Sequence, residues 1–303
     1  MLALWQANWV KSEIEKRHPG IEVSLEKIKT TGDRITDVPL AKVGGKGLFV
    51  KEIEEALLSG KVDLAVHSMK DVPTAFPTGL FLRAITERED PRDAVISKDG
   101  KKLSELPRGA RIGTSSLRRQ AQLLAVRPDF NIVQLRGNLD TRIRKLGEGR
   151  FDAIILAGAG IKRLGWADNI TEYLPPEVML PAIGQGALGI ETRIEDGYAN
   201  KLVESFDHPA TSIAVKAERA FLKKLEGGCQ VPIAAYATVV DGVPAVGDNR
   251  VRLVGLVATT DGKKIIKDSA EGAAERAEGL GVALAERLLK MGAKRILEEL
   301  YGA

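Results

Sequence analysis

The chain has 303 residues, of which 44% are hydrophobic, and a formal net charge of +4. This length predicts two or three domains, and the apolar fraction is enough for a sizeable core. The single cysteine excludes an internal disulfide framework, the three scattered histidines give no local zinc signature, and no apolar run approaches the roughly 18 residues of a membrane span. Residues 1–6 lack the basic and long apolar regions of a secretory signal. A soluble, cytoplasmic protein without a metal is therefore expected.

The positive charge is concentrated in one part of the chain. Between Arg108 and Arg163 the sequence holds ten arginines and two lysines against four acidic residues, a net charge of +8. The preference for arginine indicates planar oxyanions, carboxylate or phosphate, held by paired donors. Nucleic acid is the competing partner, but only Phe130 and Phe151 in this segment offer aromatic rings for bases. Small polycarboxylates are the better match.

The first part of the chain shows helical and extended patterns. Apolar residues recur at helical spacing from Leu2 to His18, and a proline and a glycine follow directly. The next predicted elements are a strand at Ile21–Ile28, a glycine-rich stretch at Leu40–Gly47, a helix at Phe49–Leu58 and a short buried strand at Val62–Val66.

Alternating strands and helices beyond the charged connection at residues 87–93 predict a parallel sheet flanked by helices. They are strands at Arg111–Gly113, Ile132–Leu135 and Asp152–Leu156, helices at Ser116–Val126 and Leu139–Leu146, the second capped by Asn138, and the stretch Ala157–Leu164. At the proline-containing residues 174–186, the chain is expected to cross back from one domain to another. The last part reads as a helix at Pro209–Leu225, strands at Ile233–Val240 and Val251–Ala258, and helices at Ala270–Leu289 and Ala293–Tyr301.

Two segments carry groups suited to chemistry. Asp71 follows a predicted strand end beside Lys70, where it could transfer a proton or hold a developing cation. The alternative is a turn-forming aspartate paired with its neighbour. The hydroxyls of residues 114–116 precede two arginines at a predicted helix start, which is a natural anion site. Arg136 and Arg142 flank the start of the next helix, and their side chains can converge on the opening of the same anion site.

Two glycine-rich stretches do not fit nucleotide sites. Gly44–Gly47 lacks the outer glycine of a P-loop and the Ser or Thr that follows its lysine. The stretch at residues 158–163 has Arg163 where a dinucleotide fingerprint needs its third glycine. We therefore expect no nucleotide.

The only cysteine, Cys229, lies in the stretch EGGCQVP at residues 226–232. Glycines before it and a proline after it predict an ordered turn between a helix and a strand. A lone cysteine is usually a small buried hydrophobe, so a chemical role for Cys229 depends on Asp71 and the arginine excess.

These segments together resemble the porphobilinogen deaminase (hydroxymethylbilane synthase) family over essentially the whole chain. The motifs that carry the resemblance are ALWQ (3–6), LAKVGGKGLFVKE (40–52), AVHSMKDVP (65–73), EREDPRDA (87–94), GTSSLRRQ (113–120), LRGN (135–138), DAIILA (152–157), GQGA (184–187) and EGGCQVP (226–232). Nine separated motifs in one order make coincidence a poor explanation.

The resemblance implies a transferase of tetrapyrrole synthesis that joins four porphobilinogens head to tail into hydroxymethylbilane and releases four ammonias. Cys229 matches the cysteine that carries a dipyrromethane primer through a thioether, and Asp71 matches the catalytic carboxylate. Loss of ammonia leaves an electron-poor azafulvenium, which a carboxylate can stabilise. The family also implies a cytoplasmic monomer whose product passes to uroporphyrinogen-III synthesis, with no membrane or nucleic-acid partner.

The resemblance further assigns roles to individual side chains. Each pyrrole brings two carboxylates, so a cationic cleft is expected. The primer would be held by Lys70, Asp71, Thr114, Ser115, Ser116, Arg118 and Arg119, and the substrate and growing chain by Arg136, Arg142 and Arg163. Lys46 would lie in a mobile loop over the cleft, and Gln185 in the hinge region.

The implied fold is α/β: two domains resembling type II periplasmic binding proteins, with the cleft between them, and a smaller α+β domain that presents Cys229. The corresponding ranges are 1–86 with 187–205, 92–181, and 209–303. Family members also have a first strand and a loop with an arginine and a serine before ALWQ, which this sequence lacks. A start codon assigned too far downstream or a truncation would explain this. If the 303 residues are the whole product, impaired folding of the first domain and low activity are expected.

Two other classes of function remain open. A non-catalytic binding protein for an anionic small molecule could use the same scaffold, but it requires neither Cys229 nor Asp71. A basic nucleic-acid binder should lose affinity steeply as salt rises.

Overall fold

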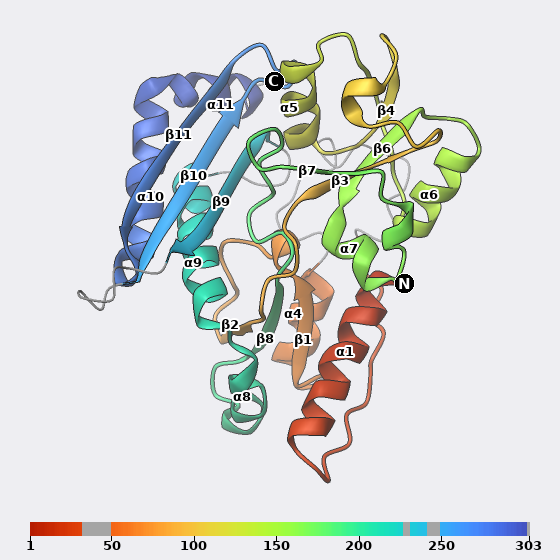
Figure 1. Ribbon diagram of the computed structural model, residues 1–303. Helices are drawn as coiled ribbons and strands as arrows, with labels where there is room; N and C mark the ends of the chain where they lie inside the picture. The colour runs from red at the N-terminus through yellow and green to blue at the C-terminus, as the bar shows by residue number, and fades with distance from the viewer. Residues whose placement is uncertain (32–49, 227–230, 241–248, 302–303) are drawn as a thin grey trace.

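The computed structural model describes residues 1–31, 50–226, 231–240 and 249–301. Its strands form three sheets, each with its own helices, which occupy separate regions of the molecule (Figure 1). No helix in these ranges is both long and apolar enough to cross a membrane.

The first sheet is antiparallel, with strand order β1-β8-β2. Its strands are β1 (Leu64–Ser68), β2 (Leu80–Ile85) and β8 (Leu188–Arg193), and its helices are α1 (Leu2–Arg17), α4 (Lys51–Leu58) and α8 (Gly197–Val203). Val10 and Ile14 of α1 pack against Ala84 and Ile190 of the sheet, because they lie one turn apart on one face of the helix. The described parts of the helices at residues 2–18 and 49–58 confirm those two predictions.

The predicted strand at residues 21–28 is wrong, because this segment has no regular secondary structure. At Val23, two side chains of α1 bond the backbone groups that a sheet would use. The Val23 N–H donates to Glu15 Oε1 at 3.0 Å, and the Val23 carbonyl accepts from Lys11 Nζ. The two backbone polar groups of Val23 are therefore satisfied without a strand partner.

The second sheet has five strands in the order β5-β4-β6-β3-β7. They are β3 (Asp93–Ser97), β4 (Arg111–Gly113), β5 (Asn131–Val133), β6 (Ala153–Ala157) and β7 (Glu172–Leu174), with helices α5 (Leu117–Val126), α6 (Leu139–Gly147) and α7 (Gly158–Arg163). The prediction of a parallel sheet holds for β4 with its neighbours β5 and β6. It is wrong for β3, which runs antiparallel between β6 and β7. The crossing chain enters this sheet through β3, so that strand runs opposite to those of the β-α-β units.

The third sheet is an antiparallel meander with order β11-β10-β9. Its strands are β9 (Ile233–Val240), β10 (Arg250–Ala258) and β11 (Ile265–Ala273), and its helices are α9 (Pro209–Lys224), α10 (Ala277–Leu288) and α11 (Lys294–Tyr301). The helix predicted from Ala270 starts too early. Residues 270–273 pair with residues 250–253 in β11, and the ladder overrides the helical pattern there.

The tip between β10 and β11 joins the third sheet to the second unit. Gly262 has a φ of 69°, and a Cβ on it would lie 2.3 Å from the Ala121 carbonyl oxygen of α5. Gln120 of the same helix donates to the Thr260 carbonyl at 3.1 Å. The α/β architecture with a C-terminal α+β unit is confirmed by the three sheets and their helices.

Candidate functional site

The segment that carries Asp71 is anchored by a buried residue and presents an exposed one. β1 runs into a short 3₁₀ turn, Met69–Asp71. The Met69 side chain is 1% exposed, and its N–H donates to the Ala187 carbonyl at 3.0 Å. Lys70 is half-buried and the Asp71 side chain is exposed. The sequence prediction that both follow a strand end is confirmed, although β1 ends at Ser68, two residues later than predicted.

Five cationic side chains form a connected cluster, and two of them, Lys70 and Arg142, lie close enough to Asp71 to interact with its charge. Burial lowers the pKa of Lys70 below its ordinary 10.5; nearby Asp71 opposes this shift, while the positive charges of Arg119 and Arg142 add to it. Burial likewise lowers the pKa of Arg142 to about 10, and the charges of Arg119 and Arg136 lower it further. Arg118 is the fifth cation of the cluster, because it and Arg119 form ion pairs with the same carboxylate, that of Asp93.

Positive charge exceeds negative charge in this cluster. Its described members are five cations (Lys70, Arg118, Arg119, Arg136 and Arg142) and two carboxylates (Asp71 and Asp93). Holding several cations close together at partly buried positions costs free energy that a bound anion would offset. The cluster is therefore suited to an acidic ligand.

Asp93 organises the interior side of the cluster, and the sequence analysis did not single it out. Its carboxylate is fully buried and accepts from Arg118 Nη1 at 2.7 Å and from Arg119 Nε and Nη2 at 3.0 and 2.8 Å. Despite burial, the two guanidinium groups hold the pKa of Asp93 well below its usual range. The charged motif EREDPRDA was the available signal, because a carboxylate that opens an apolar strand needs a partner inside.

Arg118 and Arg119 are more deeply placed than a surface anion site requires. Each is 5% exposed. Arg118 Nη1 also donates to the Leu180 carbonyl at 2.8 Å, and Arg119 Nη1 to the Ile155 carbonyl at 3.0 Å. Both side chains therefore fix the base of the site, and contacts of either one with a ligand stay a prediction.

The three hydroxyl residues form the entry to α5. Ser116 is its N-cap, and its Oγ accepts from the Arg119 N–H at 3.4 Å. Thr114 Oγ1 accepts from the Ser116 N–H at 3.2 Å, and Ser115 Oγ donates to the Leu135 carbonyl at 2.6 Å. The predicted helix start at Ser116 is confirmed. At the next helix, Asn138 occupies the N-cap position but makes no side-chain capping bond.

The motif GQGA forms the crossing between the first two sheets. Gln185 Nε2 donates to the Pro91 carbonyl at 2.6 Å and to Asp93 Oδ1 at 3.0 Å. These bonds tie the GQGA segment to residues 91–93, the other segment that connects the first two sheets. Gly184 has a φ of 70°, and a Cβ on it would lie 2.8 Å from the Cβ of Met69. The crossing thus abuts the turn that carries Asp71.

Arg163 lies apart from the five-cation cluster. Its Nη2 donates to the Gly186 carbonyl at 2.6 Å, and burial lowers its pKa while nearby Glu89 opposes that shift. It lines a cavity of ≈ 410 Å³ between α1 and the crossing, together with Trp5, Trp9, Thr86, Glu87, Arg88, Glu89 and Leu188.

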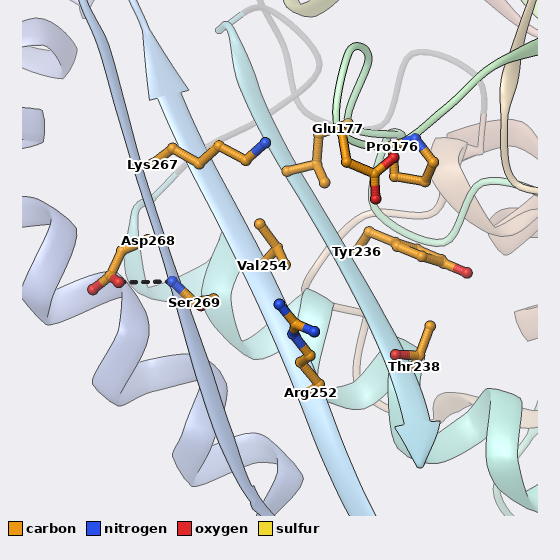
Figure 2. Close-up of a pocket in the computed structure, with 10 residues that line it drawn as sticks. Pro176, Glu177, Tyr236, Thr238, Arg252, Val254, Lys267, Asp268 and Ser269 are labelled. Atoms are coloured by element: carbon orange, nitrogen blue, oxygen red, sulfur yellow. Dashed lines mark hydrogen bonds between the residues drawn. The ribbon is translucent and has the colours of Figure 1, made fainter.

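A second cavity, of ≈ 560 Å³, contains none of the predicted site residues. It lies between the face of the third sheet that α9 and α10 leave open and the loop around Pro176 (Figure 2). Its walls are Pro176, Glu177, Leu180, Tyr236, Thr238, Arg252, Val254, Lys267, Asp268 and Ser269.

Two of the predicted functional residues, Cys229 and Lys46, lie outside the described residues. The chain on both sides of Cys229 is described. α9 ends at Lys224, and Glu226 takes a left-handed conformation with φ 54°. The chain resumes at Val231, which is 4% exposed and leads into β9. The predicted helix before Cys229 and strand after it are confirmed.

Comparison with known protein families identifies the chain. The family model described as "Porphobilinogen deaminase, dipyromethane cofactor binding domain" matches residues 1–201, and "Porphobilinogen deaminase, C-terminal domain" matches residues 212–290. The chain belongs to the porphobilinogen deaminase family. The resemblance stated from its motifs is confirmed, and with it the assignment as an enzyme of the transferase class.

Members of the porphobilinogen deaminase family are similar over nearly the whole chain. The porphobilinogen deaminase of Geotalea uraniireducens (strain Rf4) is 62% identical over 300 residues, which cover 99% of this chain and 92% of that protein. Those of Pelobacter propionicus and Geobacter sulfurreducens are each 61% identical over 300 residues and 99% of this chain, covering 94% and 92% of the relative.

Solved structures of solute-binding proteins share a more distant likeness. The substrate-binding protein of an amino acid ABC transporter aligns with 66% of this chain and 79% of its own, at 17% identity and a TM-score of 0.36. A TRAP periplasmic solute-binding protein from Desulfovibrio salexigens aligns with 68% of each chain, at 12% identity and a TM-score of 0.41. Scores this low carry no argument about ligands.

The chemistry of the described site fits the cofactor that the family model names. A dipyrromethane carries several carboxylates, and the cluster around Asp71 holds three more positive than negative charges. Arg142 uses its Nε on the Gly137 carbonyl at 2.7 Å. The guanidinium forks of Arg136 and Arg142 are of the kind that pairs with carboxylates.

Proposed function

We propose that this chain deaminates porphobilinogen and joins four units head to tail into hydroxymethylbilane, with release of four ammonias. The observation that carries the proposal is one exposed carboxylate, Asp71, beside Lys70 and Arg142 of a five-cation cluster, in a chain of the porphobilinogen deaminase family. A carboxylate and several cations in one place match a substrate with two acidic arms and a reacting centre that becomes positive.

Asp71 is the proposed catalytic residue. Loss of ammonia places positive charge on the substrate's pyrrole, and a fixed carboxylate stabilises charge as it develops. The same group can accept the proton that the pyrrole carbon loses when the new bond forms. Its exposure leaves it accessible to substrate, while the buried Met69 keeps the turn in place.

The cations have complementary proposed roles. Lys70, Arg118 and Arg119, with the hydroxyls of residues 114–116, hold the carboxylates of the primer. Arg136 and Arg142 orient the substrate and the growing chain, and Arg163 contributes from the neighbouring cavity. Arginine suits this task because its planar fork binds a carboxylate through two parallel hydrogen bonds.

Cys229 is the proposed attachment point of the dipyrromethane cofactor, through a thioether. When bound, the cofactor supplies the pyrrole carbon to which the first substrate unit is joined. The turn after α9 suits a tether, because the described helix end and the buried Val231 fix both ends of the segment. Lys46 is proposed for a loop over the cleft and Gln185 for the hinge.

The wider proposal follows the family pattern. The chain acts as a cytoplasmic monomer with domains at 1–86 with 187–205, 92–181 and 209–303, and its product is used in uroporphyrinogen-III synthesis. The first two ranges contain the strands of the first and second sheets, and the third range contains the third sheet.

The intact mass of the denatured protein tests this proposal directly. Protein expressed with porphobilinogen available should carry an addition of two pyrrole units, which Cys229→Ser should lack. Purified protein should also release ammonia and form hydroxymethylbilane from porphobilinogen. An unmodified mass together with no product would refute the proposal, whereas a modified protein with no turnover would retain the tether and remove the catalytic claim.

A further inference from the structure

The side chain of Arg219, on α9, lies behind the turn that carries Asp71. Its Nη1 donates to the Val72 carbonyl at 3.0 Å, and its Nη2 donates to the Pro73 carbonyl at 2.5 Å. The guanidinium also lies over the Phe76 ring, 5.6 Å from the ring centroid. One side chain from the C-terminal unit therefore holds the two backbone carbonyls that directly follow Asp71.

The described part of the chain offers no ion-pair partner that would explain the position of Arg219. Among the residues that the structure describes, no carboxylate lies within ion-pair distance of Arg219, and burial lowers its pKa to about 10 with no acidic group opposing the shift. A partly buried cation without a counter-ion is costly, so its contacts must offset that cost. Charge-assisted hydrogen bonds to two successive carbonyls are the contacts that do so.

The same face of α9 packs against the turn. Val215, one helical turn before Arg219, is fully buried in a cluster with Met69 and Val72. Glu218 fixes the helix at this level, because its carboxylate accepts from the Gly184 N–H at 2.7 Å and the Ala237 N–H at 2.8 Å. α9 is thus a rigid support whose end lies five residues before Cys229.

We propose that Arg219 is a positioning residue that holds the backbone after Asp71 against α9, and so sets the carboxylate relative to the helix that leads to Cys229. The inference rests on the proposed function, in which Asp71 is the catalytic group. Arg219 touches the backbone and not the reacting atoms. Its effect should therefore fall on the rate of the reaction and much less on substrate binding.

Arg219→Met tests this, because methionine keeps an unbranched side chain and removes every donor. We expect kcat to fall by about tenfold to a hundredfold, the effect of displacing a catalytic group by about 1 Å. KM should change by less than about threefold, because the proposed substrate cations do not contact Arg219. Arg219→Lys should recover part of kcat, since an ammonium can donate to either carbonyl but not to both in a fork.

Lys216→Met is the matched control. Lys216 lies on the same helix, one turn before Arg219, but is exposed and makes no hydrogen bond to the turn among the described residues. It should keep the kcat, KM and Tm of the wild-type chain. A wild-type kcat in Arg219→Met, or equal losses in Arg219→Met and Lys216→Met, would overturn the inference. If Arg219→Met does not fold, Arg219→Lys decides: a several-fold lower kcat at unchanged Tm supports positioning, and a wild-type kcat refutes it.

Amide hydrogen exchange separates this inference from the proposed function. In Arg219→Met the peptide covering residues 69–76 should exchange faster than in the wild type, with the rest of the first sheet unchanged. This readout needs no turnover. If wild-type protein is inactive with porphobilinogen, the proposed function fails while the exchange result still decides whether Arg219 holds the turn. Unchanged exchange at residues 69–76 would show that it does not.

Discussion

Replacing the buried carboxylate of Asp93 should cost more stability than any other single charge change in the second unit. Asp93→Asn keeps the side-chain size but removes the negative charge that faces Arg118 and Arg119, and it aims an amide N–H₂ at groups that only donate. Removing one partner of a buried pair typically costs about 3–5 kcal/mol, because the other charge stays buried and unpaired. That is a large part of the roughly 5–15 kcal/mol by which a domain is stable.

The pH dependence gives this prediction a sign. The pKa of Asp93 is depressed in the folded state from its ordinary value of 3.8. Its contribution to stability is therefore fully present above that value and is lost as the pH falls toward the depressed one. The difference in stability between Asp93→Asn and the wild type should be constant near neutral pH and should shrink only in strong acid.

Urea unfolding followed by circular dichroism measures the loss. Asp129→Asn is the matched control, because Asp129 also accepts hydrogen bonds from an arginine through both carboxylate oxygens. Its single partner is Arg127, at 2.9 and 2.8 Å, and this pair lies near the surface. The control should lose far less stability than Asp93→Asn. Equal losses in the two variants, or a loss below about 1 kcal/mol for Asp93→Asn, would refute the argument from burial.

Three further predictions concern the site and its crossing. Asp71→Asn should keep the Tm but lower turnover of porphobilinogen by about 10²- to 10⁴-fold, and near-normal rates would remove Asp71 from catalysis. Gly186→Ala should lower the free energy of unfolding, measured in urea, by at least about 2 kcal/mol, because the φ of Gly186 is 97° and a Cβ would lie 2.2 Å from the Glu89 carbonyl oxygen. Gly20→Ala is the control and should cost less, because Gly20 has a similar φ of 95° but open space around it. Binding of free dipyrromethane to cofactor-free protein should weaken as the pH rises toward the lowered pKa of Lys70, because Lys70 is a proposed primer ligand, and Lys70→Met should abolish that alkaline limb in a titration of binding.

Much of the local structure could be predicted from the chain alone. Helical spacing placed α1 and α9, Ser116 marked the start of α5, and the strand before Lys70 placed both candidate groups at a strand end. These features depend on residues near one another in sequence, where periodicity and capping chemistry act. The motifs also identified the family, because their order and content do not depend on packing.

Only the tertiary structure decided which long-range partners each group has. The segment at residues 21–28 carries a strand pattern, but it forms no strand, and the backbone of Val23 within it bonds to side chains of α1. β3 is antiparallel because the crossing chain enters its sheet from the opposite direction, which no local pattern encodes. Asp93 gathers donors from two arginines 25 and 26 residues away and from a glutamine 92 residues away.

Arg219 illustrates the same division. On the sequence it is one of many cations on an amphipathic helix, and Glu218 beside it was detectable as a charge on the apolar face. Its contacts with Val72 and Pro73 span 147 and 146 residues. The sequence by itself determined the helices, the family and the chemical groups of the site, because these depend on local pattern and residue type. The packing of distant segments decided that Arg142 lies beside Asp71 and that Arg219 bonds the backbone that follows it.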